Sequence, residues 1–141
     1  MIRGLLILVA GVGVGVAGMA AVQHQAGESV TPLSARDIAE KLDGKDARAT
    51  VVEVTLQPGQ AGAPHRHPGP VFGYVLEGQY ELGIDDQPSR VLKAGETFYE
   101  PTGCLHRVSK NPAATGKTRV LAVVLHPRDA KAVAIPEGKA H

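Results

Sequence analysis

The chain has 141 residues, enough for one domain with a substantial apolar core. Fifteen lysines and arginines balance fourteen aspartates and glutamates, so the chain lacks the basic excess of proteins that bind nucleic acid, and we expect no such partner. Seventeen glycines and ten prolines without a collagen-like period favour short strands joined by turns, which predicts an all-β protein.

Residues 1–22 have the composition of a targeting segment. Arg3 is followed by an uncharged stretch from Gly4 to Val22 that ends in small residues, as before a signal-peptidase site. The stretch also approaches the length of about 20 apolar residues that spans a bilayer. The segment is therefore a cleaved signal peptide or an uncleaved membrane anchor, with a soluble structural helix as the remaining alternative. Either of the first two predicts an exported domain, periplasmic or membrane-anchored, which meets the membrane only through this segment.

Residues 23–48 are expected to form a tether and one short helix. Ser34 and Asp37 have the spacing of a capping box, and Ile38 and Leu42 follow at helical spacing. Gly44 then ends the helical pattern, so the helix is predicted over residues 34–42.

Between residues 49 and 126 the pattern changes to strands separated by turn residues, which is typical of a sandwich or a barrel. Glu77 and Gly78 are expected to form a tight turn between two of these strands. The tail, residues 127–141, is predicted to cover one end of the barrel loosely. The seven predicted strands are Thr50 to Leu56, Val71 to Leu76, Gln79 to Ile84, Ser89 to Leu92, Thr97 to Glu100, Leu105 to Ser109 and Thr118 to Leu125.

Three histidines in two motifs are the candidate metal ligands. His65 and His67 are two residues apart, and on an extended strand such side chains point to the same side. His106 follows about forty residues later and could complete a metal-binding face from another strand of the same β-structure. Neutral imidazole is the commonest metal ligand in proteins.

The two blocks that contain these histidines resemble the signature motifs of the cupin family. The first has the form Gly-x5-His-x-His from Gly59, and the second has the form Gly-x5-Pro-x-Gly-x2-His from Gly95. The resemblance spans Thr50 to Leu125. It implies a double-stranded β-helix, or jelly-roll barrel, with a metal inside its mouth held by His65, His67 and His106.

The chain departs from the family pattern at two places. The first motif of the family usually continues with a glutamate ligand four or five residues after its second histidine, where this chain has Val71 and Phe72. The second motif normally has asparagine four residues after its histidine, where Lys110 stands, with Asn111 one residue later. We therefore expect a three-histidine site without a carboxylate ligand.

Strand alternation suggests which residues surround this site. If Val71 faces inward, so does Gly73, which would leave room for a small ligand above the metal or would only mark a bulge. Cys104 lies two residues before His106 and could face the site, although a buried, inert cysteine is the commoner case. As the only cysteine it cannot form an intramolecular disulfide. Glu100 and Tyr80 are further candidates that the sequence alone does not place, as are His126, Tyr74 and Tyr99.

Three imidazoles leave open coordination positions, which predicts a divalent metal ion that meets a small-molecule ligand. The resemblance makes iron the expected metal of an enzyme, because some cupin dioxygenases use three-histidine iron; zinc, manganese, nickel and copper also suit the ligands. We therefore predict a dioxygenase-type oxidoreductase acting on a small organic substrate. The alternatives are a non-catalytic module that binds or senses a ligand or metal, an isomerase, and a barrel that has lost its metal. A homodimer through the outward residues Phe72, Tyr74 and Leu76 is also expected.

Overall fold

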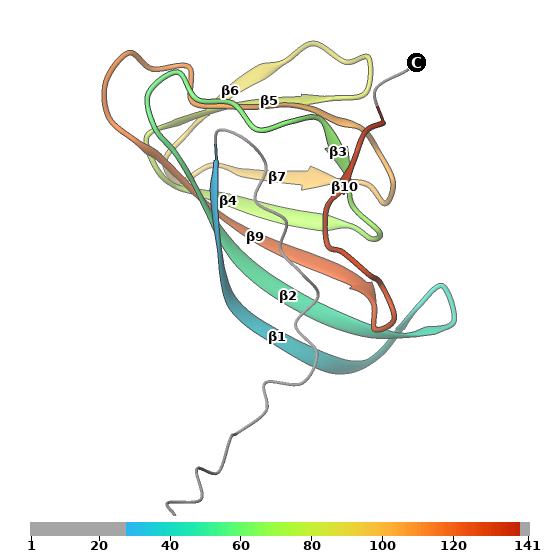
Figure 1. The fold of residues 1–141 in the computed structure, drawn as a ribbon. Coiled ribbons are helices and arrows are strands. Elements are labelled where there is room, and N and C mark those ends of the chain that lie inside the picture. The colour runs from blue at the N-terminus through green and yellow to red at the C-terminus, as the bar shows by residue number, and fades with distance from the viewer. Residues whose placement is uncertain (1–27, 139–141) are drawn as a thin grey trace, which may run out of the picture.

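The computed structural model describes residues 28–138, which form two antiparallel five-stranded sheets packed face to face (Figure 1). One sheet has the strand order β1-β2-β9-β4-β7, and the other has the order β10-β3-β8-β5-β6. This is the expected all-β jelly-roll architecture. The strands are β1 (Ser29–Leu42), β2 (Lys45–Leu56), β3 (His65–Arg66), β4 (Val71–Glu77), β5 (Gln79–Ile84), β6 (Arg90–Lys93), β7 (Thr97–Glu100), β8 (His106–Lys110), β9 (Thr118–Pro127) and β10 (Ile135–Pro136).

The core lies between the sheets because each central strand alternates an inward apolar side chain with an outward one. In β9 every second residue is buried along its whole length, and β4 repeats this pattern from Val71 to Val75. The largest buried cluster draws Leu56, Val75 and Val120 from one sheet and Tyr80 and Leu82 from the other. Three members of this cluster, Tyr80, Phe98 and Val120, also line the cavity of the candidate site, so the core and the site adjoin each other.

The seven predicted strands are present, and six of them have bounds within two residues of those expected, whereas β2 begins at Lys45 and not at Thr50. The predicted helix over residues 34–42 is wrong, because this segment lies in β1, which pairs with β2 from Ser29 to Leu42. Asp37, read as a capping residue, instead lies opposite Arg48 of β2 and accepts a hydrogen bond from its Nε at 2.7 Å. Backbone pairing to a sheet edge and these cross-strand contacts outweigh the local helical spacing.

The predicted turn at Glu77 and Gly78 carries the chain from one sheet to the other. It separates β4 and β5, which lie in different sheets. The φ of Gly78 is +77°, and a Cβ at this position would lie 2.4 Å from the carbonyl oxygen of Lys117. Glycine is required here both by the positive φ and by the close approach of the backbone at Lys117.

The C-terminal tail is attached to the barrel more firmly than expected. Its strand β10 pairs with β3, and Val133 is buried in an apolar cluster with residues of β2, β4 and β9. Arg66 of β3 also forms an ion pair with Glu137, with Nε and Oε2 2.9 Å apart. This tail therefore forms part of the wall around the candidate site.

Neither the leader nor the extreme C-terminus can be compared with its prediction, because residues 1–27 and 139–141 lie outside the described residues. Between residues 28 and 138 no helix could cross a membrane.

Candidate metal centre

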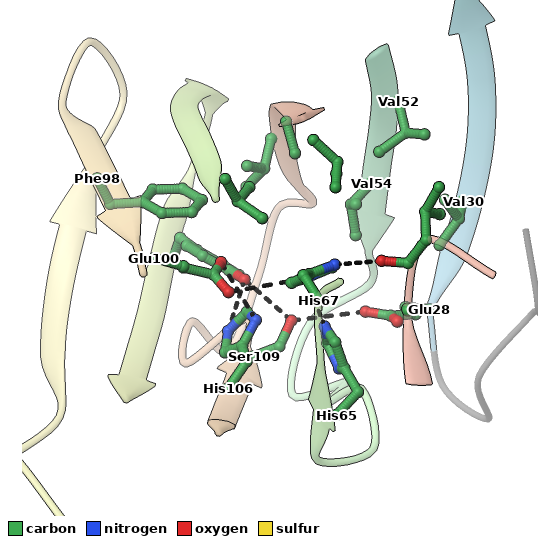
Figure 2. Close-up of a pocket in the computed structure, with 17 residues that line it drawn as sticks. Glu28, Val30, Val52, Val54, His65, His67, Phe98, Glu100, His106 and Ser109 are labelled. Atoms are coloured by element: carbon green, nitrogen blue, oxygen red, sulfur yellow. Dashed lines mark hydrogen bonds and ion pairs between the residues drawn. The ribbon is translucent and has the colours of Figure 1, made fainter. Parts of the chain in front are cut away.

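The three predicted ligands come together inside the barrel. His65 of β3 lies directly opposite His106 of β8 in the sheet, and His67 follows β3 by one residue (Figure 2). One nitrogen of each ring lies within 4.8 Å of one nitrogen of each other ring. His65 and His106 are buried and His67 nearly so. The arrangement can hold one metal ion.

His65 and His67 turn unprotonated nitrogens toward each other. The Nδ1–H of His65 donates to the carbonyl oxygen of Ala63 at 2.8 Å, and the Nδ1–H of His67 donates to that of Val133. Because a carbonyl oxygen can only accept, each neutral ring carries its proton on Nδ1 and leaves Nε2 bare. The two Nε2 atoms are 3.1 Å apart, where two lone pairs repel unless a cation lies between them.

The third imidazole is oriented through its other nitrogen. Nε2 of His106 is 3.2 Å from the hydroxyl of Tyr80, which itself donates to Oγ of Ser109 at 3.1 Å. Ser109 in turn donates to Glu28 at 3.5 Å. The hydroxyl proton of Tyr80 is already donated to Ser109, so the hydroxyl oxygen can only accept from Nε2 of His106. Nε2 of His106 therefore carries the proton of the neutral ring, and Nδ1 bears the free lone pair. Such hydrogen bonds from the far side of the ring are the usual way in which proteins orient ligating histidines.

Burial keeps these imidazoles neutral, as metal ligands must be. Desolvation, followed by repulsion from His65, lowers the pKa of His67 to about 4. Desolvation, with repulsion from His65 and His67, lowers the pKa of His106 to about 3. Burial also lowers the pKa of His65, opposed by its bond to Ala63. The three rings are therefore neutral at neutral pH, and their free lone pairs are available to a metal ion.

A buried carboxyl group completes the polar part of the site. Glu100, at the end of β7, is 2% exposed, with Oε1 3.3 Å from Nδ1 of His106 and Oε2 3.7 Å from Nε2 of His67. Burial raises its pKa to about 8. Among the described residues, Oε2 of Glu100 and Nδ1 of His106 are the buried side-chain atoms without a hydrogen-bond partner. Two unpartnered electron-pair donors that face the same space fit a metal ion.

The remaining walls of the cavity are apolar. Its volume is about 60 Å³, which leaves room for an ion and a small ligand. No lysine or arginine is among the described residues that line it. The lining consists of the polar residues Glu28, His65, His67, Tyr80, Glu100, His106 and Ser109 and the apolar residues Val30, Val52, Val54, Val71, Phe98, Val120, Ala122, Val124, Val133 and Ala134.

Of the three predicted pocket residues, Val71 lines the cavity and the other two do not. One of the two interpretations of Gly73 was room for a ligand, but that space is taken by the ring of Phe98, because a Cβ on Gly73 would lie 2.0 Å from Cζ of that ring. Cys104 is buried away from the cavity. Burial, followed by the negative charges of Glu100 and Asp85, raises the pKa of its thiol to about 11, so it stays protonated and unreactive.

Two other polar residues considered in the sequence analysis, Asn111 and His126, serve the fold. The side-chain amide of Asn111 donates to the carbonyl oxygens of Leu56 and Gly116. His126 is buried on β9, with Nε2 2.8 Å from Oγ1 of Thr50, and does not line the cavity. Tyr74 and Tyr99 point outward and do not line it either.

A small jelly-roll barrel that surrounds three histidines from two motif blocks has the architecture of a single-domain cupin. Residues 52–124 match the Cupin domain family. This match covers more than half of the chain, which therefore belongs to the cupin family.

The relatives identified by sequence are plant proteins. The chain is 34% identical over 88 residues to oxalate oxidase 1 of Hordeum vulgare and to germin-like protein 3-5 of Oryza sativa subsp. japonica. Each match covers 57% of this chain and, respectively, 42% and 37% of the relative. The chain thus matches less than half the length of these relatives.

Solved structures show the same fold. An oxalate oxidase in complex with the substrate analogue glycolate superposes with a TM-score of 0.56 at 27% identity, covering 77% of this chain and 57% of the other. A double-stranded β-helix protein from Klebsiella pneumoniae superposes with a TM-score of 0.60 at 22% identity, covering 83% of this chain and 91% of the other. At that identity the second similarity concerns the fold alone.

Proposed function

We propose that this cupin binds one divalent metal ion through His65, His67 and His106 and uses it as a dioxygenase-type oxidoreductase on a small organic substrate. The observation that carries the proposal is the pair of unprotonated Nε2 atoms 3.1 Å apart in a buried cavity. The similarity to oxalate oxidases supports an oxidative reaction. The ion would supply Lewis acidity and open coordination positions, and iron is the metal we expect if the protein is an enzyme.

The protein residues bind, orient and shield in this proposal. The carbonyl oxygens of Ala63 and Val133 and the hydroxyl of Tyr80 hold the three imidazoles in one tautomer each. The valines of the cavity exclude water from the reacting groups, which strengthens every charge interaction inside. Substrate and metal would therefore meet in a dry chamber with fixed polar groups on one side.

The lining also favours a class of substrate. Among the described residues, the cavity is lined by two carboxyl groups and by no lysine or arginine. The metal ion would therefore be the only positive charge available to a dianion such as oxalate. A neutral molecule, or a monoanion with one metal-binding oxygen, suits the apolar walls better. We therefore propose a small enol, ketone, phenol or thiol as the substrate.

Oxygen consumption tests the reaction. The protein purified without oxygen and loaded with Fe²⁺ should consume dioxygen with at least one compound from a panel of thiols, diketones and phenols, and not with oxalate. The His106→Ala variant, which lacks one ligand, should consume none. Absence of uptake with every compound would contradict catalysis, and uptake with oxalate would contradict the substrate class.

A non-catalytic binding module is the second candidate. The described residues that line the cavity include no activated nucleophile, and they include no acid–base pair apart from the groups that face the metal site. Both observations favour binding without catalysis. Saturable binding of a panel compound to the metal-loaded protein, with neither oxygen uptake nor a product, would identify this function.

We propose export for the barrel, since Arg3 precedes an uncharged segment that ends at Val22. Cell fractionation of the full chain should place the barrel outside the cytoplasm. The N-terminal sequence of the recovered protein would distinguish a cleaved signal peptide from an anchor.

We also propose a homodimer formed through the outward face of β4. Phe72, Tyr74 and Leu76 are 52%, 43% and 38% exposed there, and the ring of Phe72 lies 5.2 Å from that of Tyr99. A contiguous apolar surface of this kind is often covered by a partner. Sedimentation should detect a dimer that Phe72→Glu dissociates, and a monomer at high concentration would contradict it.

A further inference from the structure

The carboxylate that the first cupin motif lacks is present on the neighbouring strand. Val71 of β4 occupies the place of the usual glutamate ligand, and its partner in β7 is Glu100. Directly opposed residues of paired strands project from the same face of a sheet, with Cβ atoms about 5 Å apart. Both side chains line the metal cavity. The carboxyl group of Glu100 thus enters the cavity from β7, next to the position on β4 from which the family's glutamate ligand comes.

The contacts of Glu100 are those of a ligand rather than of a structural ion pair. Its two oxygens face Nδ1 of His106 and Nε2 of His67, the nitrogens that bear free lone pairs. No lysine or arginine lines the cavity among the described residues, and Oε2 has no hydrogen-bond partner. A buried carboxylate without a donor or a cation beside it is unfavourable, so Glu100 would ionise only when a cation enters the space that its oxygens share with the two imidazole nitrogens.

We propose that Glu100 is the fourth protein ligand of the metal ion, supplied by β7 in place of the β4 residue of the family motif. This inference rests on the metal site of the proposed function. It replaces the three-histidine site expected from the sequence with a set of three neutral imidazoles and one carboxylate, which leaves a divalent ion with a net charge of +1. Because the carboxylate comes from β7, the wall of the cavity at Val71 of β4 remains apolar.

Metal binding by the full-length protein tests the assignment without any activity measurement. Mn²⁺ affinity is measured by calorimetry, and the ligand set is measured by the visible absorption of bound Co²⁺. Glu100→Gln, which keeps the shape of the side chain, should weaken Mn²⁺ binding by at least about 10–100-fold, the loss caused even by removing a group that supports a ligand. It should also change the Co²⁺ spectrum. The matched control is Glu40→Gln on the exposed surface of β1, which should alter neither.

A relocation variant separates ligation from a general effect of charge. Val71→Glu combined with Glu100→Val moves the carboxylate to the position used by the family and should restore Mn²⁺ affinity relative to Glu100→Val alone. Lack of restoration in a folded double variant would overturn the cross-strand replacement.

The unsubstituted protein provides a measurement that does not depend on the folding of any variant. With ¹³C-labelled glutamate, infrared difference spectra on addition of Zn²⁺ should show the bands of one glutamate side chain shift to those of a metal-bound carboxylate. Unchanged glutamate bands, or wild-type Mn²⁺ affinity in Glu100→Gln, would overturn the inference while leaving the three-histidine site intact. Failure of the unsubstituted protein to bind any of the three ions would instead overturn the proposed function.

Discussion

Gly73 and Phe98 are directly opposed in β4 and β7, and the phenyl ring lies where a side chain on Gly73 would be. The missing Cβ therefore allows the ring to lie across the strand and reach both the core and the wall of the cavity. The ring is tilted against Tyr80, with centroids 5.5 Å apart, and Tyr80 orients His106. The glycine acts on the site through packing and not through open space.

Substitution of this glycine should destabilise the barrel. In Gly73→Ala the new methyl group would overlap the ring of Phe98, and overpacking of this kind costs about 1–3 kcal/mol of unfolding free energy. Urea denaturation measures the loss. Gly73→Ala with Phe98→Leu should recover part of it, and Gly138→Ala, which meets no atom within 4 Å, is the control. Unchanged stability of Gly73→Ala would contradict this account of the contact.

The strands could be predicted where the necessary information is local. β4 and β9 combine apolar alternation with turn residues at their ends, and both features are visible in a short window. β1 could not be recognised, because it is an exposed edge strand whose Ile38 and Leu42 also have helical spacing. The two-residue strands β3 and β10 exist only through pairing with distant segments.

The metal ligands could be predicted because their motifs are also local in the sequence. The glycines and prolines of each motif stand at fixed intervals from His65, His67 and His106, and this spacing identified the three histidines as ligands. Glu100 was not placed, because its role depends on the register that sets it opposite Val71. The available signal was strand alternation: an acidic residue two positions after Phe98 points inward with it.

The metal-free protein should lose stability on acidification below about pH 6.5. The pKa of His67 is lowered to about 4 and that of His106 to about 3, from an ordinary value of 6.5. Between these values the unfolded chain binds protons that the folded protein excludes, so the unfolding free energy rises with pH across this window. Unfolding in the presence of a chelator measures the slope, which should be smaller in His106→Gln. A slope as steep in that variant as in the unsubstituted protein would contradict the assignment.

Above pH 6.5 the carboxyl group should reverse the trend. The pKa of Glu100 is raised from 4.5 to about 8, so the folded metal-free protein retains a proton that the unfolded chain releases. Its contribution to stability is complete below pH 4.5 and is lost as the pH rises through 8. Three imidazoles outweigh it at acidic pH, and the metal-free protein should therefore be most stable near pH 6.5. Glu100→Gln should remove the alkaline decline, and a decline of equal size in that variant would assign it to another group.

Metal binding at neutral pH should release a proton from Glu100. The imidazoles are already unprotonated there, whereas the carboxyl group must ionise to ligate the ion. Calorimetry of Zn²⁺ binding at pH 7 in buffers of different ionisation enthalpy should give about one proton released, since a group with a pKa near 8 is mostly protonated at that pH. The Glu100→Gln variant should release almost none. Release by that variant as large as in the unsubstituted protein would point to water or histidine as the source.

The C-terminal tail should set metal affinity through one carbonyl group. Val133 accepts the Nδ1–H of His67, and Glu137 fastens the tail to Arg66 beside it. A chain that ends at Ala132 loses the acceptor, so the ring is free to turn and Mn²⁺ affinity should fall by about 10–100-fold. A chain that ends at Gly138 should bind normally.

Packing and hydrogen bonding can be separated at this position. Val133→Ala in the full chain keeps the backbone carbonyl but removes buried methyl groups, which costs about 1–3 kcal/mol of unfolding free energy. It should therefore lower stability while Mn²⁺ affinity stays close to that of the unsubstituted protein. If affinity fell as far in Val133→Ala as in the chain that ends at Ala132, the tail would act through the packing of the barrel wall, and the carbonyl group would not be what orients His67.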